Sequence, residues 1–85
     1  MKNVIDQQQI LKVYELIQQH GEEGEHGKTW RGITVSSDFD GYTLYFQGQG
    51  VFLTYGFHNT YHLEYDTERN KEVFFNQLKQ IEQDH

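Results

Sequence analysis

The stretch "WRGITVSSDFDGYTLYFQGQGVFLTYGFHNTYHLEY", residues 30–65, decides the fold because apolar and polar side chains alternate along most of its length. A period of two residues is typical of β-strands that bury one face. Turn sequences at Asp40-Gly41, at Gly48-Gln49 and at residues 58–60 divide the stretch into segments of strand length. The stretch therefore predicts a four-stranded antiparallel meander.

The turns also predict which residues lie opposite one another in neighbouring strands. We expect these pairs: Phe39 with Tyr42, Val35 with Phe46, Phe46 with Val51, Leu44 with Leu53, Tyr42 with Tyr55, Phe57 with Tyr61, Tyr55 with Leu63, and Leu53 with Tyr65. All of these side chains fall on one face, and a slip of one residue would scatter them over both faces. The last hairpin is thus expected to contribute Phe57, Tyr61, Leu63 and Tyr65 to the core.

Apolar side chains at intervals of three and four residues predict two helices. One precedes the sheet in the sequence, over about residues 5–20, and the other follows it, over about residues 67–83. The first apolar stripe consists of Ile10, Leu11, Val13, Tyr14, Leu16 and Ile17. The second consists of Val73, Phe74, Leu78 and Ile81, with Phe75 at its margin.

Polar residues mark the helix ends. Asn3 or Asp6 can cap the first helix, because their side chains can accept hydrogen bonds from the first free N–H groups. That helix is expected to end at His20, which a glycine follows. Asp66 or Thr67 can cap the second helix in the same way.

Residues 21–29, "GEEGEHGKT", contain three glycines and no apolar side chain, so they are expected to form a mobile loop. The sheet has one apolar face and each helix one apolar stripe, which favours both helices on the same face. The predicted fold class is α+β, a two-layer sandwich of helix, four-stranded antiparallel meander sheet and helix. Residues 1–85 are expected to form a single domain, since so short a chain supports one core.

Composition excludes several classes of function. The formal net charge is -6, and the seven Lys and Arg residues form no cluster, so no nucleic-acid partner is expected. No segment approaches the roughly 18 apolar residues of a membrane span, and polar residues interrupt the N-terminal segment where a leader would be apolar. The absence of cysteine excludes disulfides, thiolate metal sites and a cysteine nucleophile. We expect a cytoplasmic protein without membrane contact or cofactor.

The polar face of the predicted sheet is the first candidate for a functional site. It presents Asp38, His62 and Glu64, with Gly56 opposite His62 leaving a small gap beside the imidazole. These side chains can bind a small ligand, or they belong to a solvated face stabilised by cross-strand pairs. His58 and His62 are four residues apart, about 13 Å along a strand, so no metal site is predicted unless the turn folds His58 back.

Aromatic side chains are the second candidate. Tyr45 and Phe52 are expected on the polar face, and Trp30 can extend them into an exposed aromatic patch of the kind found at interfaces. In the alternative interpretation, Trp30 covers the end of the core. The first and last strands also offer unpaired backbone groups to a protein partner or to a second copy of the chain.

No catalytic residues are predicted. Ser36 and Ser37 are the only serines, and neither has the glycine-flanked turn or the neighbouring base of a serine nucleophile. A domain of 85 residues also has little volume for a cleft. We therefore expect a non-enzymatic protein-interaction or regulatory module, with self-association among its modes. The alternative is a protein that binds a small ligand or metal through the polar face and the His58/His62 hairpin.

Three segments together resemble a known family: "MKNVIDQQQILKVYELIQQHG", "SSDFDGYTLYF" and "FHNTYHLEY". The family consists of small bacterial proteins that are described only as a domain of unknown function, and the resemblance covers most of the chain. It implies a stand-alone cytoplasmic protein. It implies no activity and no catalytic or ligand residues.

Overall fold

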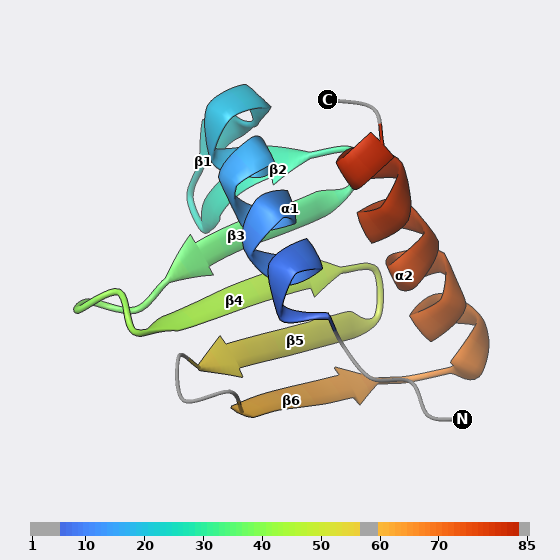
Figure 1. Ribbon diagram of the computed structural model, residues 1–85. Helices are drawn as coiled ribbons and strands as arrows, with labels where there is room; N and C mark the ends of the chain where they lie inside the picture. The colour runs from blue at the N-terminus through green and yellow to red at the C-terminus, as the bar shows by residue number, and fades with distance from the viewer. Residues whose placement is uncertain (1–5, 57–59, 84–85) are drawn as a thin grey trace.

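The computed structural model describes residues 6–56 and 60–83. Its fold class is α+β, with helix α1 (Gln7–His20), a six-stranded antiparallel sheet and helix α2 (Glu68–Gln83) (Figure 1). The strands are β1 (Glu22–Gly24), β2 (Gly27–Trp30), β3 (Ile33–Ser37), β4 (Thr43–Gly48), β5 (Val51–Gly56) and β6 (Thr60–Tyr65). They lie in the sheet in chain order, so the sheet is a simple meander.

The segment 21–29 is not the loop that the sequence predicts, because β1 and most of β2 lie within it. Glu22 lies opposite Thr29 in the β1–β2 pair, and β2 continues onto β3 with Lys28 opposite Val35. Strands at a sheet edge are held by main-chain hydrogen bonds, for which apolar side chains are not required. The sheet therefore has six strands and not the predicted four. The additional hairpin, β1 with β2, extends the sheet beyond its apolar region.

The predicted pairing of β3 with β4 is confirmed, with Val35 opposite Phe46. The two later pairings are displaced by two residues: Phe46 lies opposite Leu53, and Leu53 lies opposite Leu63. The β4–β5 turn is formed by residues 49–50, one position later than predicted, with Gly50 at φ 71°. A displacement of two residues keeps every side chain on its own face. For these two pairings the predicted faces of the described residues were right, although the predicted partners were wrong.

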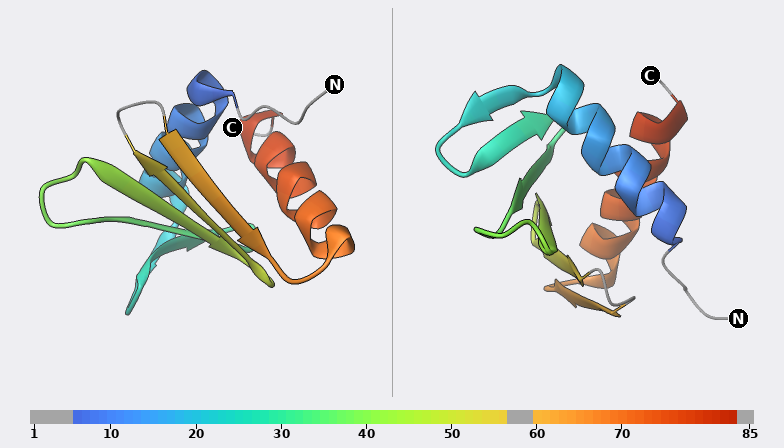
Figure 2. Two further views of the ribbon diagram at one scale, coloured as in Figure 1. Left: turned by 90° about the horizontal axis from the view of Figure 1, so that it is seen from below. Right: turned by 60° about the vertical axis from the view of Figure 1, so that its left-hand side comes forward.

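The core lies between the sheet and the two helices. α1 packs over β2 and β3 and against α2, and α2 packs over β3, β5 and β6. Figure 2 shows both helices on the same side of the sheet. The buried residues form one cluster: Ile10, Val13, Leu16 and Ile17 of α1, Ile33, Val35, Leu44, Phe46, Val51, Leu53 and Tyr55 of the sheet, and Phe74, Leu78 and Ile81 of α2. Each large apolar side chain in it contributes about 1.5–3 kcal/mol through burial.

Capping residues define both ends of α1 and the start of α2, as predicted. The Asp6 carboxylate accepts a hydrogen bond from the N–H of Gln8 at 3.0 Å. The hydroxyl oxygen of Thr67 accepts one from the N–H of Asn70 at 3.1 Å. α1 ends at His20, and the following glycine closes the last turn. Asn3 and the predicted start of the helix at residue 5 lie outside the described residues.

Several predicted core residues are exposed. Tyr61 and Tyr65 are 45% and 41% exposed, because β6 is the edge strand and lies at the margin of the helices. Leu63 is half-buried against the core. Phe39 and Tyr42 are also exposed, since they lie in the β3–β4 turn beyond the last pair of the ladder. On α2 the buried apolar stripe is narrower than predicted, because Val73 is 43% exposed. Phe57, another predicted core residue, lies outside the described residues.

Candidate functional site

The face of the sheet opposite the buried cluster carries mostly polar side chains, and we call it the outer face. Its members alternate with the core-side residues along β3 to β6: Thr34, Ser36, Thr43, Tyr45, Gln47, Phe52, Thr54, Gly56, Thr60, His62 and Glu64. The sequence places these residues there because each lies one position from a residue of the same strand that faces the helices. The outer face therefore contains the polar and aromatic residues that the sequence singled out on these four strands.

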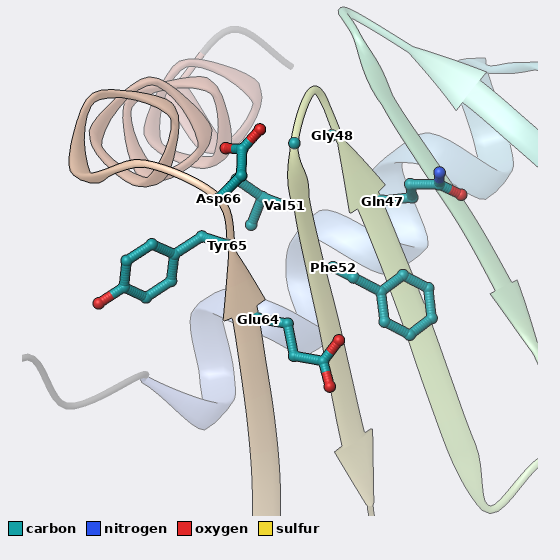
Figure 3. Close-up of a pocket in the computed structure, with 8 residues that line it drawn as sticks. Gln47, Gly48, Val51, Phe52, Glu64, Tyr65 and Asp66 are labelled. Carbon is teal, nitrogen blue, oxygen red and sulfur yellow. The ribbon is translucent and has the colours of Figure 1, made fainter.

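An aromatic pair lies near the centre of the outer face. The ring centroids of Tyr45 and Phe52 are 5.9 Å apart, with the ring planes inclined by 23°. The two residues are diagonal neighbours, since Tyr45 lies opposite Thr54 and Phe52 opposite Gln47. Figure 3 shows how Gln47, Phe52 and Glu64 lie on neighbouring strands. These three residues are among those that line an open hollow, whose volume is about 380 Å³. Phe52 remains 37% exposed, so the pair offers an apolar surface to solvent.

Trp30 does not join this aromatic pair. It lies opposite Ile33, a buried residue, and therefore faces the core side of the sheet. Its ring packs on the ring of His20 with centroids 4.9 Å apart, and the Arg31 guanidinium carbon lies 5.0 Å from the indole ring. Trp30 thus covers the end of the core, which was the alternative to its joining an exposed aromatic patch.

Two of the three predicted ligand residues meet. The imidazole Nε2 of His62 lies 3.0 Å from the carboxylate Oε2 of Glu64, and both side chains are about two-thirds exposed, at 69% and 67%. Asp38 lies in the turn between β3 and β4. β3 is three strand spacings from β6, a distance of about 14 Å across the sheet. The Asp38 carboxylate accepts a hydrogen bond from the N–H of Gly41 at 3.0 Å and stabilises the turn. The structure therefore joins His62 with Glu64 and leaves Asp38 apart.

The predicted pairing of Gly56 with His62 is wrong, because Thr54 lies opposite His62 and Gly56 lies opposite Thr60. A small hollow nevertheless lies beside His62. Its volume is about 200 Å³, and it is lined by Thr43, Thr54, Gly56, Thr60, Tyr61 and His62. Pockets that hold small molecules are commonly about 300–1,000 Å³, so this one is small. Among residues 6–56 and 60–83, no group of three or more His, Cys, Asp or Glu side chains could hold a metal ion. His58, the other half of the predicted histidine pair, lies outside those ranges.

A cluster at the end of β6 was not predicted. The ammonium of Lys71 lies 4.9 Å from the centre of the Tyr65 ring and 3.2 Å from a Glu68 carboxylate oxygen. The Tyr65 hydroxyl donates a hydrogen bond to the same carboxylate at 3.3 Å. The hydrogen bond with Glu68 raises the pKa of the Lys71 amine above its ordinary value of 10.5, and partial desolvation opposes this shift. The spacing of three between these residues, at the start of a helix, is the signal that could have found the cluster.

β6 is one of the two edges of the sheet, and every residue in it is exposed or half-buried. Its side chains alternate between the two faces, with Tyr61, Leu63 and Tyr65 on the core side and His62 and Glu64 on the outer side. Figure 1 shows β6 as the last strand, followed directly by α2. The outer face and the β6 edge together make the candidate interaction surface.

Within the described residues, neither helix is long and apolar enough to cross a membrane. Searches of curated proteins and of solved structures gave no match to the chain. A family model does match, over residues 5–85, and it is described as "Protein of unknown function (DUF3081)". Because that match covers nearly the whole sequence, the chain belongs to the DUF3081 family.

Proposed function

We propose that the protein is a small non-enzymatic module that acts by association with other protein chains, using its sheet as the contact surface. The observation that carries this proposal is the position of its exposed large apolar side chains. Five of the six in the described residues belong to the sheet or to the β3–β4 turn: Phe39, Tyr42, Phe52, Tyr61 and Tyr65. The sixth, Val73, is on α2. Aromatic side chains are enriched at protein interfaces, which favours the sheet over the helices as the contact surface.

The chemistry of the polar groups is consistent with a module that does not catalyse a reaction. A nucleophilic or basic lysine needs a lowered pKa, whereas the hydrogen bond with Glu68 raises that of Lys71 and keeps the amine protonated. The hollows on the outer face are open and shallow, so they would not exclude water from a reacting group.

A second candidate is the binding of a small ligand or metal by the outer face. The observation that favours it is the contact of His62 with Glu64 beside the small hollow that His62 also lines. Zinc, nickel and a panel of small carboxylates can be titrated while the histidine NMR signals are recorded. Saturable shifts of the His62 signals would support this candidate. Unchanged signals at all concentrations would remove it.

We propose, from the sequence, that the protein acts in the cytoplasm. The chain has no cysteine, so its folding needs no oxidising compartment. Fractionation of cells that express the tagged chain tests this, because recovery in a secreted or membrane fraction would contradict it.

Photo-crosslinking in cells tests the association function. A photoreactive phenylalanine analogue at Phe52 or Tyr61 places the probe on the candidate interaction surface, and one at Gln80 places it on an exposed position of α2 as the control. We expect discrete light-dependent adducts from the two sheet positions and none from position 80. Mass spectrometry would identify the captured chain, whether a second copy or another protein. A folded, expressed protein that gives no adduct from the sheet positions would contradict the function.

A further inference from the structure

The two edges of the sheet differ in length and chemistry. β1 has three residues, Glu22–Gly24, and two of them are glutamates; short, charged edge strands resist pairing with another chain. β6 has six residues and carries Tyr61, Leu63 and Tyr65 on its core side. It has neither lysine nor proline, the residues that commonly protect edges. Of the two edges, β6 is therefore the one suited to pairing.

The backbone of β6 shows which residues face outward at this edge. The N–H of Asp66 donates to the carbonyl oxygen of Gly50 on the β5 side at 3.0 Å. Hydrogen-bonded and non-hydrogen-bonded positions alternate along an antiparallel pair. Like Asp66, the even-numbered residues of β6 therefore point their N–H and C=O groups toward β5, where they form hydrogen bonds. The N–H and C=O groups of Tyr61, Leu63 and Tyr65 consequently point to the free edge.

The sequence of β6 is chemically complementary to its own reverse. The order Tyr61-His62-Leu63-Glu64-Tyr65 has an aromatic residue at each end, and an imidazole and a carboxylate on either side of the central leucine. We propose that two copies of the chain associate through β6, in antiparallel pairing about a two-fold axis at Leu63. This inference rests on the association function proposed above and names a second copy as the partner.

The proposed register suits the backbone and the side chains together. Tyr61 lies opposite the partner subunit's Tyr65, and Leu63 opposite the partner subunit's Leu63, at positions where each pair exchanges two N–H···O bonds. His62 lies opposite the partner subunit's Glu64 at a non-hydrogen-bonded position, where Cα atoms are about 4.5 Å apart and side chains are closest. The core-side row of tyrosines and leucine, half-covered in one chain, continues into the same row of the other.

Side-chain chemistry selects this register from its neighbours. An axis at His62 would place the imidazoles of the two copies opposite each other, and an axis at Glu64 would place two carboxylates opposite each other, which is destabilising. Registers that set an odd residue opposite an even one would bring the tyrosine row against the polar outer face. The axis at Leu63 places an imidazole opposite a carboxylate twice and keeps each face continuous.

A single introduced thiol tests the register, because the chain contains no cysteine. In a Leu63→Cys variant the two Cα atoms at the axis would be about 5.5 Å apart, within the range of a disulfide. In a Tyr61→Cys variant the two thiols would be offset by about 13 Å along the strands. With oxidised glutathione, we expect Leu63→Cys to form a linked dimer and Tyr61→Cys alone to form none. An equal mixture of Tyr61→Cys and Tyr65→Cys is expected to form the mixed dimer.

Charge variants test the contact between His62 and Glu64 across the axis. His62→Glu makes both positions acidic, and the double change His62→Lys with Glu64→Lys makes both basic. Because like charges then meet twice, we expect each variant alone to dimerise about tenfold more weakly than the wild type in sedimentation velocity. An equal mixture should recover wild-type affinity. Neither variant has oppositely charged residues at positions 62 and 64 of one chain, so recovery on mixing reports contact between chains.

The outcomes separate this inference from the function on which it rests. A wild-type dimer that forms while Leu63→Cys does not link, or while the charge variants do not recover on mixing, would overturn the β6 interface and leave association intact. A wild-type chain that sediments as a monomer up to millimolar concentration would overturn self-association. Light-dependent capture of another protein through Phe52 would then still support the association function, whereas its absence as well would remove both.

Discussion

A β-carbon on Gly27 would lie 2.1 Å from the carbonyl oxygen of Val35, so β2 and β3 approach each other more closely than a residue with a side chain permits. Gly27 also has φ 131°, a conformation that other residues rarely adopt. The glycine is thus a requirement of the β1–β2 hairpin.

Gly27→Ala is expected to destabilise the fold by about 1–3 kcal/mol, because it combines backbone strain with a steric overlap at main-chain atoms that cannot move independently. Urea unfolding of the two proteins measures this difference, and hydrogen exchange should show the loss concentrated in β1 and β2. Gly24→Ala is the matched control, since a β-carbon at Gly24 would be 3.7 Å from its nearest neighbour. Equal stability of Gly27→Ala and wild type would contradict the close approach.

The same hairpin shows where sequence patterns stop being informative. Strands β3 to β6 were predictable because apolar and polar residues alternate along them, and a turn misplaced by one position does not change the faces. β1 and β2 contribute glutamate, glycine, lysine and threonine to the edge of the sheet, so no apolar period marks them. Their stability comes from main-chain bonds to a neighbouring strand, which a pattern of side chains does not encode.

Leu78 and Val73 of α2 belong to one predicted apolar stripe, yet they differ in burial. Leu78 is fully buried and Val73 is 43% exposed. Leu78→Ala is expected to cost about 2–5 kcal/mol through lost burial and a residual cavity, whereas Val73→Ala should change stability by no more than about 0.5 kcal/mol. Chemical denaturation of both variants gives the comparison. A large loss at Val73 would show that the helix buries a different side.

Predictability of the candidate site follows the same division. The shared face of Tyr45 and Phe52, and of His62 and Glu64, follows from a period of two residues, so both pairs could be placed from the sequence. Trp30 could not be assigned, because the interpretation depended on whether strands lay beyond the first predicted one. The stacking of Lys71 on Tyr65 depends on side-chain torsions at the junction of β6 with α2, and no periodic pattern specifies those.

The cap of α2 is expected to depend on the Thr67 hydroxyl. Thr67→Ala removes the acceptor for the N–H of Asn70 and should cost about 0.5–2 kcal/mol. Thr67→Ser keeps an acceptor in the same place and should retain most of the stability. Thermal unfolding followed by circular dichroism measures both. If the alanine and serine variants were equally destabilised, the hydroxyl would not be the source of the effect.

The ion pair of Lys71 with Glu68 makes a pH-dependent contribution to stability. The folded-state pKa of Lys71 is raised above its ordinary value of 10.5, so the folded chain holds this proton more tightly than the unfolded chain does. The contribution is therefore complete below pH 10.5 and is lost as the pH rises through the higher folded value. We expect the stability difference between wild type and Lys71→Met to be constant from neutral pH to about pH 10 and to shrink above it.

Urea unfolding across this pH range measures the difference. Lys79→Met, a change at an exposed position of the same helix, is the control for ionisation elsewhere in the chain. A difference that grew with alkaline pH would reverse the sign of the linkage and exclude Lys71 as its source.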